Sequence, residues 1–365
     1  MYAKDHLYAL LLAGGKGTRF WPLSREDHPK QLLKLFSDNT LVEETYERIL
    51  PLVPSDRILI ATSKGLAPRL RALFPDLPER NLIVEPVARN TAPCIAVAAR
   101  RILSRDPKAI IAVLPSDHFV SDRQGFLDIM EAAATHAARG RVVTLGITPT
   151  HPETGYGYIR FGEFEADPEH PDTKHRARLI QAFVEKPDHQ TAVSYLKAGR
   201  YLWNSGIFII RADTILDKVR AHLPVLADCV ERLSGIDVGE DADADAIRSC
   251  WADMPDISID YGVMEKAEGL VVIPSSFGWS DVGTWRALSA FPTDEAENFV
   301  YGKVVAVDSS ESVLYCSHGM LATLGLHNMV VVVTRGAVLV CPADRTQDVK
   351  AVVEELKARN QTEYL

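Results

Sequence analysis

LYALLLAGGKGTR, residues 7–19, is the most informative stretch of this 365-residue sequence. Its first half, residues 7–13, is a short apolar run that stops at two glycines, and such a run predicts a buried strand. In the second half, glycines let backbone amides approach phosphate oxygens without a Cβ in the way, while two basic side chains add charge. We therefore predict a strand followed by a phosphate-binding loop, the Gly-rich loop, consisting of Gly14, Gly15, Lys16, Gly17, Thr18 and Arg19.

Two familiar phosphate-loop patterns do not fit this loop. A Walker A loop needs Gly-Lys-Ser/Thr, but Lys16 is followed by Gly17. A dinucleotide fingerprint needs GxGxxG, but Phe20 stands where the third glycine would be. The alternative to phosphate binding is a plain glycine turn between a strand and a helix, and the two basic residues inside the turn argue against it.

The first half of the chain repeats this strand pattern. Apolar runs recur at residues 57–61, 109–114 and 141–146, and helical spacing appears between them at 91–103 and 123–138. Strands that alternate with helices predict βαβ units, so we expect an α/β fold with a Rossmann-like, mixed but mainly parallel sheet flanked by helices. In such sheets ligands bind in the loops after the carboxyl ends of the strands.

The spacing of apolar runs changes after about residue 298. Short apolar runs at 302–307, 313–315, 320–324, 329–333 and 338–340 are separated by turn residues, and a helical pattern follows at 346–359. We predict two domains: residues 1–297 as the catalytic domain, and residues 298–365 as a small C-terminal β module with a terminal helix.

Composition limits the classes of partner. The formal net charge of −9 argues against coating nucleic acid, which needs a basic face. The five cysteines are scattered and form no CxxC pair, which indicates reduced thiols in a cytoplasmic protein. The sequence has neither a signal-peptide pattern nor an apolar run of about 20 residues, so we expect neither secretion nor a membrane partner.

Polar residues before the predicted helix at 91–103 suggest contacts with a base. Residues 85–93 have the sequence EPVARNTAP, in which Glu85, Arg89, Asn90 and Thr91 offer donors and acceptors. Asn90 or Thr91 could instead cap the helix. Helix capping explains the presence of Thr91 more easily than that of Arg89 or Asn90. Lys30, in the short motif PKQ at 29–31, is a further candidate for nucleotide binding, although a surface lysine that starts a helix is the plainer interpretation.

Two aspartates are candidate Mg²⁺ ligands. Asp117 comes just after the predicted strand 109–114, and Asp281 lies in the sequence GWSDVG at 278–283. Two carboxylates from distant loops, together with phosphate oxygens, suit a hard octahedral cation. Each aspartate could instead serve a turn or a helix cap. His118, beside Asp117, is expected to support the loop.

Three short motifs in the middle of the chain suggest a sugar site: TGYGY at 154–158, VEKP at 184–187 and WNSG at 203–206. Glu185 can accept hydrogen bonds from sugar hydroxyls, Lys186 can meet a phosphate, and Asn204 offers both a donor and an acceptor. Gly155 and Gly157 permit close backbone approach, and Gly206 of the WNSG motif is a further candidate for the sugar site. Each motif is weak by itself, because NSG is usually a turn.

Together these motifs resemble the sugar nucleotidyltransferases, and RNTAP, WNSG and GWSDVG resemble the mannose-1-phosphate guanylyltransferase branch in particular. The resemblance runs from residue 11 to about residue 349. It implies the nucleotide-diphospho-sugar transferase fold, a triphosphate held by the Gly-rich loop and Lys16, and a sugar phosphate held by Lys186. It also implies Mg²⁺ at Asp117 and Asp281, sugar contacts from Gly157, Glu185 and Asn204, and base contacts around Glu85 and Asn90.

The function that the resemblance implies is transfer of GMP from GTP to α-D-mannose 1-phosphate. One rival is a related enzyme that uses glucose 1-phosphate and another nucleotide. A rival from a different class is a catalytically silent sensor of nucleotide sugars, which would be expected to have lost part of the charged set. We expect a homo-oligomer, with a dimer as the first hypothesis. Since no stretch is long enough for the cupin-type isomerase domain of some relatives, phosphomannose isomerase activity is not expected.

Overall fold

The computed structural model describes residues 2–15, 17–25, 27–165, 175–184, 186–234, 236 and 245–365. The chain divides into two compact units. The first comprises Met1–Gly14, Tyr46–Pro115 and Val120–Trp279, and the second comprises Gly15–Thr45, Ser116–Phe119 and Ser280–Leu365. The second unit thus combines the C-terminal module with most of the Gly-rich loop. The domain boundary predicted from the sequence, between residues 297 and 298, remains a prediction.

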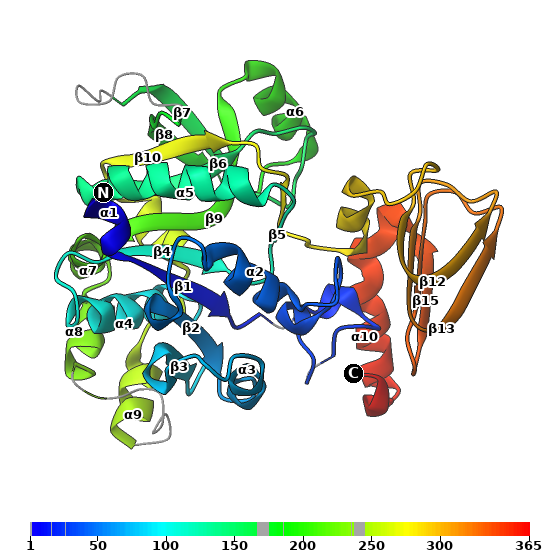
Figure 1. Ribbon diagram of the computed structural model, residues 1–365, viewed down its shortest axis with the longest axis horizontal. Helices are drawn as coiled ribbons and strands as arrows, with labels where there is room; N and C mark the ends of the chain where they lie inside the picture. Colours follow the sequence, from blue (N-terminus) through cyan, green and yellow to red (C-terminus); the bar gives the residue numbers. More distant parts are fainter. Residues whose placement is uncertain are drawn as a thin grey trace. The chain divides into compact units, whose positions relative to one another are not determined.

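A nine-stranded sheet forms the centre of the first unit (Figure 1), in the order β3-β2-β1-β4-β9-β6-β10-β8-β7. The strands are β1 (Leu7–Ala13), β2 (Ile58–Ser63), β3 (Leu82–Glu85), β4 (Ile110–Pro115), β6 (Val142–Ile147), β7 (Tyr158–Phe164), β8 (Arg178–Val184), β9 (Tyr201–Arg211) and β10 (Leu270–Ser275). Strands β3, β2, β1 and β4 run parallel, as do β6 and β10. Strand β9 pairs antiparallel with both β4 and β6, so the sheet is mixed.

Helices cover the sheet of the first unit. They are α1 (Tyr2–Asp5), α3 (Ala67–Leu73), α4 (Thr91–Leu103), α5 (Arg123–Ala138), α6 (His189–Ala198), α7 (Ala212–His222), α8 (Pro224–Arg232) and α9 (Asp245–Asp253), while α2 (Leu41–Ile49) links the two units. Tyr8 and Leu10 of β1 join one buried cluster with α4, α7, α8 and α9. Since every residue of β1 except the partly buried Leu12 is buried, both of its faces are covered, as expected for a parallel strand.

The C-terminal module is built from stacked strands. Strands β12 (Phe299–Val307), β13 (Val313–Leu324) and β14 (Met329–Val333) pair in parallel, and β15 (Val338–Pro342) closes the sheet antiparallel to β14. The runs predicted separately at 313–315 and 320–324 form the single strand β13, whose two buried parts both pair with β12 on either side of a register shift at its exposed middle. The predicted helix at 346–359 consists of a 3₁₀ segment, Ala343–Asp348, followed by α10 (Val349–Ala358).

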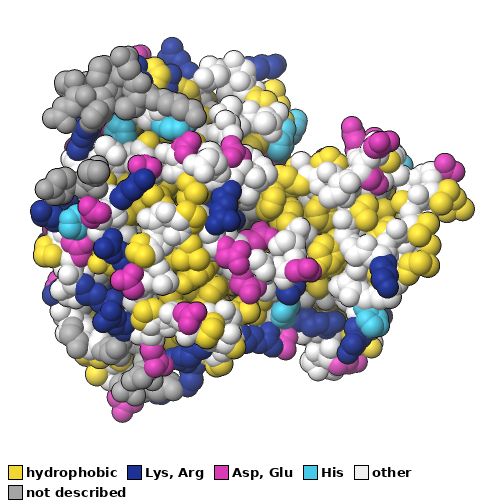
Figure 2. Space-filling view, viewed as in Figure 1, with side chains coloured by type: hydrophobic (Ala, Val, Ile, Leu, Met, Phe, Trp, Pro, Cys, Tyr) yellow, Lys and Arg dark blue, Asp and Glu magenta, His cyan; other side chains and the backbone are white. Residues whose placement is uncertain are grey.

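The module leaves apolar side chains exposed. Val305 and Val307 on β12, and Val338 and Val340 on β15, are each about half exposed, and Leu324 at the end of β13 is 73% exposed. Figure 2 shows apolar atoms along the outer edge of this module. Exposed apolar residues in such number are unusual for strands that face only water.

Among the described residues, the longest apolar helices fall short of what is needed to traverse a bilayer.

Candidate active site

The second unit contains a cavity of about 400 Å³, here called the Lys30 cavity. It is lined by Gly17, Thr18, Arg19, Phe20, Lys30, Asp117, His118, Asp281, Gly283 and Lys350. The structure therefore brings together six of the predicted site residues, which come from four motifs far apart in the sequence. Lys350 belongs to no motif that the sequence analysis singled out.

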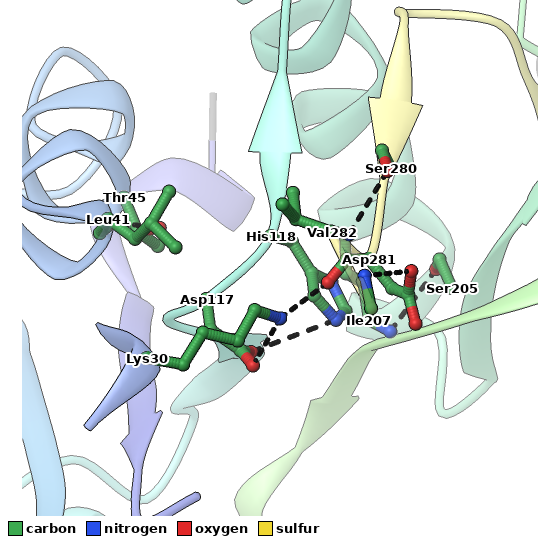
Figure 3. Close-up of polar contacts among 11 residues, drawn as sticks. Lys30, Leu41, Thr45, Asp117, His118, Ser205, Ile207, Ser280, Asp281 and Val282 are labelled. Atoms are coloured by element: carbon green, nitrogen blue, oxygen red, sulfur yellow. Dashed lines mark hydrogen bonds and ion pairs between the residues drawn. The ribbon is translucent and has the colours of Figure 1, made fainter. Parts of the chain in front are cut away.

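Lys30 organises this cavity. The residue is only 7% exposed, which excludes the plainer interpretation of a surface lysine. The Nζ atom donates to Oδ2 of Asp117 at 2.8 Å and to the backbone oxygen of Asp281 at 2.6 Å (Figure 3). One ammonium group thus fixes the two loops that carry the predicted metal ligands.

The Gly-rich loop packs directly against Lys30. Gly17 has φ 61°, in the left-handed region, and an added Cβ there would lie 2.3 Å from Cβ of Lys30. Only glycine satisfies both the backbone angle and the close approach. Thr18–Phe20 then forms a 3₁₀ turn, in which Phe20 is buried against Trp285 with ring centroids 5.0 Å apart.

Arg19 is the cation of this turn. Its Nε atom is buried and has no hydrogen-bond partner among the described residues. A buried guanidinium donor without a partner is costly, so a ligand that supplies an acceptor there is favoured. Phosphate oxygens are suitable acceptors for arginine.

Asp117 is held ionised. Burial alone would raise the pKa of its carboxyl group, but the nearby charges of Lys30 and His118 and the hydrogen bond from Lys30 outweigh burial, so the pKa lies below its ordinary value. Nε2 of His118 lies 3.9 Å from Oδ1 of Asp117, in agreement with a supporting role for this histidine.

Asp281 sits in a strained loop. Its Oδ1 accepts from the backbone N–H of Gly283 at 2.9 Å. The next residue, Val282, is fully buried and has φ 47°, a conformation that β-branched residues rarely adopt. Such strain persists only where the surrounding structure enforces it, and it is commonly found at functional sites.

The predicted sugar residues of the first unit form a second cluster. The backbone N–H of Asn204 donates to Gly157 O at 2.8 Å, and Asn204 Oδ1 accepts from the N–H of Gly206 at 3.1 Å. Asn204 Nδ2 donates to Oδ1 of Asp260 at 2.9 Å. The amide is therefore fixed in one orientation, and Asp260, for which the sequence analysis gave no role, is the residue that fixes it.

A π-helical turn, Asp260–Met264, carries Asp260, and such turns are frequent at functional sites. The segment before it joins the predicted base motif, because Thr91 Oγ1 accepts from the N–H of Ile259 at 2.9 Å. Thr91 is thus used for this contact, and Asn90 is the helix cap: its Oδ1 accepts from the N–H of Thr91 at 3.0 Å, at φ 64°. Asn90 therefore takes the role for which Thr91 was the better sequence candidate.

Arg89 and Glu85 complete the base motif. Nη2 of Arg89 donates to the backbone oxygen of Ala252 at 2.7 Å, at the end of α9. Glu85 ends β3, and burial raises its pKa to about 7, with a hydrogen bond to the Cys94 thiol acting in the opposite direction. A carboxyl group that is half protonated near neutral pH can both donate and accept hydrogen bonds.

This raised pKa makes a prediction about stability. The folded-state pKa of Glu85 lies above its ordinary value. The stability that this carboxyl group contributes to the folded state is therefore fully present below about pH 4.5 and is lost as the pH rises through about 7. Between about pH 5 and pH 8, the free energy of unfolding of Glu85→Gln should therefore fall by roughly 1–3 kcal/mol less than that of wild type. Urea unfolding at several pH values measures this difference, with Glu79→Gln, at an exposed position, as the control. If the free energies of unfolding of wild type and Glu85→Gln change with pH in the same way, the raised pKa of Glu85 is contradicted.

Lys186 follows β8 in the first unit. It is exposed and has φ 30°, in the left-handed region. Residue Asp188 then caps α6, its Oδ1 accepting from the N–H of Thr191 at 2.8 Å. The backbone of Lys186 is thus held between a strand and a capped helix. Two other predicted site residues, Lys16 and Glu185, lie outside the described residues.

The comparisons with known proteins agree with this fold. A family model described as nucleotidyl transferase matches residues 8–298. A second, described as MannoseP isomerase/GMP-like beta-helix domain, matches residues 302–356. The second match covers the stacked parallel strands of the C-terminal module.

Individual relatives are more specific. A mannose-1-phosphate guanylyltransferase from Salmonella muenchen is 38% identical over 367 residues, which cover 98% of this chain and 75% of that protein. Xanthan biosynthesis protein XanB from Xanthomonas campestris pv. campestris is 39% identical over 361 residues, covering 97% of this chain and 74% of that protein. A crystal structure from Thermus thermophilus, described as a mannose-1-phosphate geranyltransferase, aligns with a TM-score of 0.85 and 39% identity, and covers 96% of this chain and 99% of that one.

The mixed α/β sheet, the Gly-rich loop and the β module define an enzyme of the nucleotidyltransferase class. Within that class, the chain belongs to the mannose-1-phosphate guanylyltransferase family. The predicted fold class, the enzyme class and the family resemblance are therefore confirmed.

Proposed function

We propose that this protein transfers GMP from GTP to α-D-mannose 1-phosphate and releases GDP-mannose and pyrophosphate. The observation that carries the proposal is the Lys30 cavity, which joins the Gly-rich loop to two carboxylates and to a buried arginine donor without a partner among the described residues. The relatives named as mannose-1-phosphate guanylyltransferases support the choice of substrates.

The reaction is an in-line displacement. A phosphate oxygen of mannose 1-phosphate attacks the α-phosphorus of GTP, the bond from that phosphorus to the bridging oxygen of the β-phosphate breaks, and pyrophosphate takes the electron pair. No protein nucleophile is required, so the protein contributes positioning and neutralisation of charge.

Charge repulsion is the main obstacle. Two like unit charges about 5 Å apart cost roughly 3 kcal/mol at an effective dielectric constant of about 20, and two polyanions form several such pairs. A chain with a net charge of −9 cannot offset this repulsion with its overall field. Cations must therefore be placed locally, and we assign this role to Lys16, Arg19 and Lys186.

The cavity also suits Mg²⁺. Within the described residues, no group of three or more His, Cys, Asp and Glu side chains is arranged to hold a metal ion. Mg²⁺ in nucleotide sites is usually held by one or two carboxylates together with phosphate oxygens and water, and Asp117 and Asp281 both line the Lys30 cavity. We propose that these two carboxylates hold it. When bound, it would neutralise charge on the phosphates.

Asp281→Asn tests this assignment. Loss of one anionic ligand should raise the Mg²⁺ concentration needed for half-maximal activity by about tenfold or more. The measurement is a Mg²⁺ titration of initial rates at saturating GTP and mannose 1-phosphate. Asp344→Asn, at an exposed position of the C-terminal module, serves as the control. An unchanged titration in Asp281→Asn would count against a metal role.

In the first unit, we assign Lys186 to the phosphate of mannose 1-phosphate, and Gly157, Glu185, Asn204 and Gly206 to the sugar. The fixed amide of Asn204 supports this assignment, because a preoriented donor and acceptor can discriminate between hydroxyl configurations. Glu85, Arg89, Asn90 and Thr91 are assigned to the base side, and Lys30 acts on the nucleotide through the loops that it holds.

A pyrophosphate-release assay over a matrix of substrates tests the function. GTP, ATP, UTP and dTTP are each combined with mannose 1-phosphate and with glucose 1-phosphate. The proposal expects the highest kcat/KM for GTP with mannose 1-phosphate. Preference for glucose 1-phosphate with another nucleotide would favour the related enzyme instead, and GTP binding without pyrophosphate release would favour the sensor.

We further propose a homodimer in the cytoplasm. The apolar side chains exposed on β12, β13 and β15 support self-association, and the described cysteines, all free thiols, support a reducing compartment. Light scattering coupled to size-exclusion chromatography distinguishes a monomer from a dimer.

A further inference from the structure

We propose that Lys350, from the C-terminal helix α10, binds the phosphates of GTP that leave as pyrophosphate. This inference rests on the proposed function, because it names a further binding group for the same substrate. Its starting observation is that Lys350 lines the Lys30 cavity together with Gly17, Thr18 and Arg19 of the Gly-rich loop.

The position of Lys350 is set by the core beneath it. Its neighbour Val349 and the residue one turn on, Val353, are buried in the same apolar cluster as Phe20 and Trp21. Phe20 and Trp21 directly follow the Gly-rich loop in the sequence. Packing on one shared core therefore fixes the first turn of α10 beside the loop.

Polar contacts fasten the same elements together. Nε1 of Trp21 donates to the backbone oxygen of Tyr364 at 2.8 Å, and Nε1 of Trp285 donates to the backbone oxygen of Trp21 at 3.1 Å. The hydroxyl of Thr346, just before α10, donates to that of Thr284, just after the Asp281 loop, at 3.3 Å. The C-terminal segment is thus anchored next to two of the segments that line the cavity, the Gly-rich loop and the Asp281 loop.

The charges of the cavity show what Lys350 adds. Lys30 is already engaged by Asp117 and by the backbone of Asp281, so its charge mainly offsets an aspartate. Lys350 is exposed and, within the part of the chain that the structure describes, its ammonium has no hydrogen-bond or ion-pair partner. Together with Arg19 it is a cation on the cavity wall that remains available to an anionic ligand.

Lysine suits this position chemically. An ammonium on a flexible stem acts as a point charge that can follow phosphate oxygens as they move from GTP to pyrophosphate. The C-terminal helix α10 would then supply a substrate-binding group. The Gly-rich loop and α10, both in the second unit, would bind the phosphates of GTP together.

The experiment compares Lys350→Ala, Lys350→Arg and the control Lys357→Ala, which removes the same charge from the same helix two turns further on. Four quantities are measured for each: the Kd of GTP by titration calorimetry with Mg²⁺, the KM of pyrophosphate in the reverse reaction, the KM of mannose 1-phosphate, and the Tm. For Lys350→Ala we expect the Kd of GTP and the KM of pyrophosphate to rise by about 10- to 100-fold, because a hydrogen bond between charged groups is lost.

The other quantities separate binding from a structural role. The KM of mannose 1-phosphate and the Tm should stay as in wild type, Lys350→Arg should restore GTP binding to within about threefold, and Lys357→Ala should behave as wild type. Unchanged GTP and pyrophosphate constants in Lys350→Ala would overturn the proposal, and so would a fall in Tm together with a rise in all three constants. If wild type binds GTP but transfers no GMP, the proposed function fails, while the Kd of GTP in Lys350→Ala still decides the role of Lys350.

Discussion

Lys186→Ala is expected to lower kcat/KM for GMP transfer by about 100- to 1,000-fold, the usual loss when a group that stabilises charge in the transition state is removed. The KM of mannose 1-phosphate should rise, because Lys186 is assigned to its phosphate, whereas the Kd of GTP should change little. Steady-state kinetics in both substrates and calorimetric titration of GTP measure these effects.

The backbone around Lys186 supports this expectation. At φ 30° the residue adopts a conformation that lysine rarely takes, between the end of β8 at Val184 and the cap of α6 at Asp188. Backbone strain of this kind persists only where the surrounding structure enforces it, and it is concentrated at active sites and ligand clamps. Lys197→Ala, an exposed lysine near the end of α6, is the matched control. Near-normal turnover in Lys186→Ala would remove this residue from the site.

Lys30→Met should have the second large effect, a fall in kcat/KM of about 100-fold or more, through loss of the loop arrangement around Asp117 and Asp281. The folded state should also lose about 1–3 kcal/mol, less than for a fully buried ion pair, because the Asp117 side chain remains 32% exposed. Kinetics and urea unfolding measure the two losses, and Lys34→Met, at an exposed lysine four residues on, is the control.

The same substitution should change the pH dependence. In wild type the pKa of Asp117 is depressed, so its stabilising contribution is present above the ordinary pKa and is lost as the pH falls through the folded-state pKa. Without Lys30, burial raises the pKa of Asp117, and the acid limb of the kcat/KM profile should move to higher pH. An acid limb at the wild-type position with unchanged kcat/KM would show that Lys30 does not organise the site.

Several elements were predictable because their signals are local. The strand Leu7–Ala13 and the helices Thr91–Leu103 and Arg123–Ala138 have the predicted bounds. Apolar spacing, together with a glycine or a capping residue at the end, decides such elements with little help from distant contacts. Strand β9 shows the limit of this reasoning, because nothing local indicates that it runs antiparallel to β4 and β6.

The candidate site was also predictable in part. The sequence indicated Gly17, Arg19, Asp117 and Asp281 from glycine, charge and position after strands, and the structure places all four on one cavity. No role could be assigned to Asp260 from the sequence, because it acts through a hydrogen bond to Asn204 from 56 positions away. Lys350 carried no signal either, because a lysine in an amphipathic helix looks like any solvated residue.

Residue types and local periods alone determined that this chain has an α/β core, and its motifs identified the family. The phosphate-binding role of the Gly-rich loop is a prediction from the same residue types. Tertiary structure decided which charges meet. It buried Lys30 between two aspartate loops, gave Asn90 the cap that Thr91 could have taken, and set the first turn of the last helix beside the Gly-rich loop. The physical reason is that burial and ion pairing depend on which distant segments share a core, and a sequence pattern contains no information on that packing.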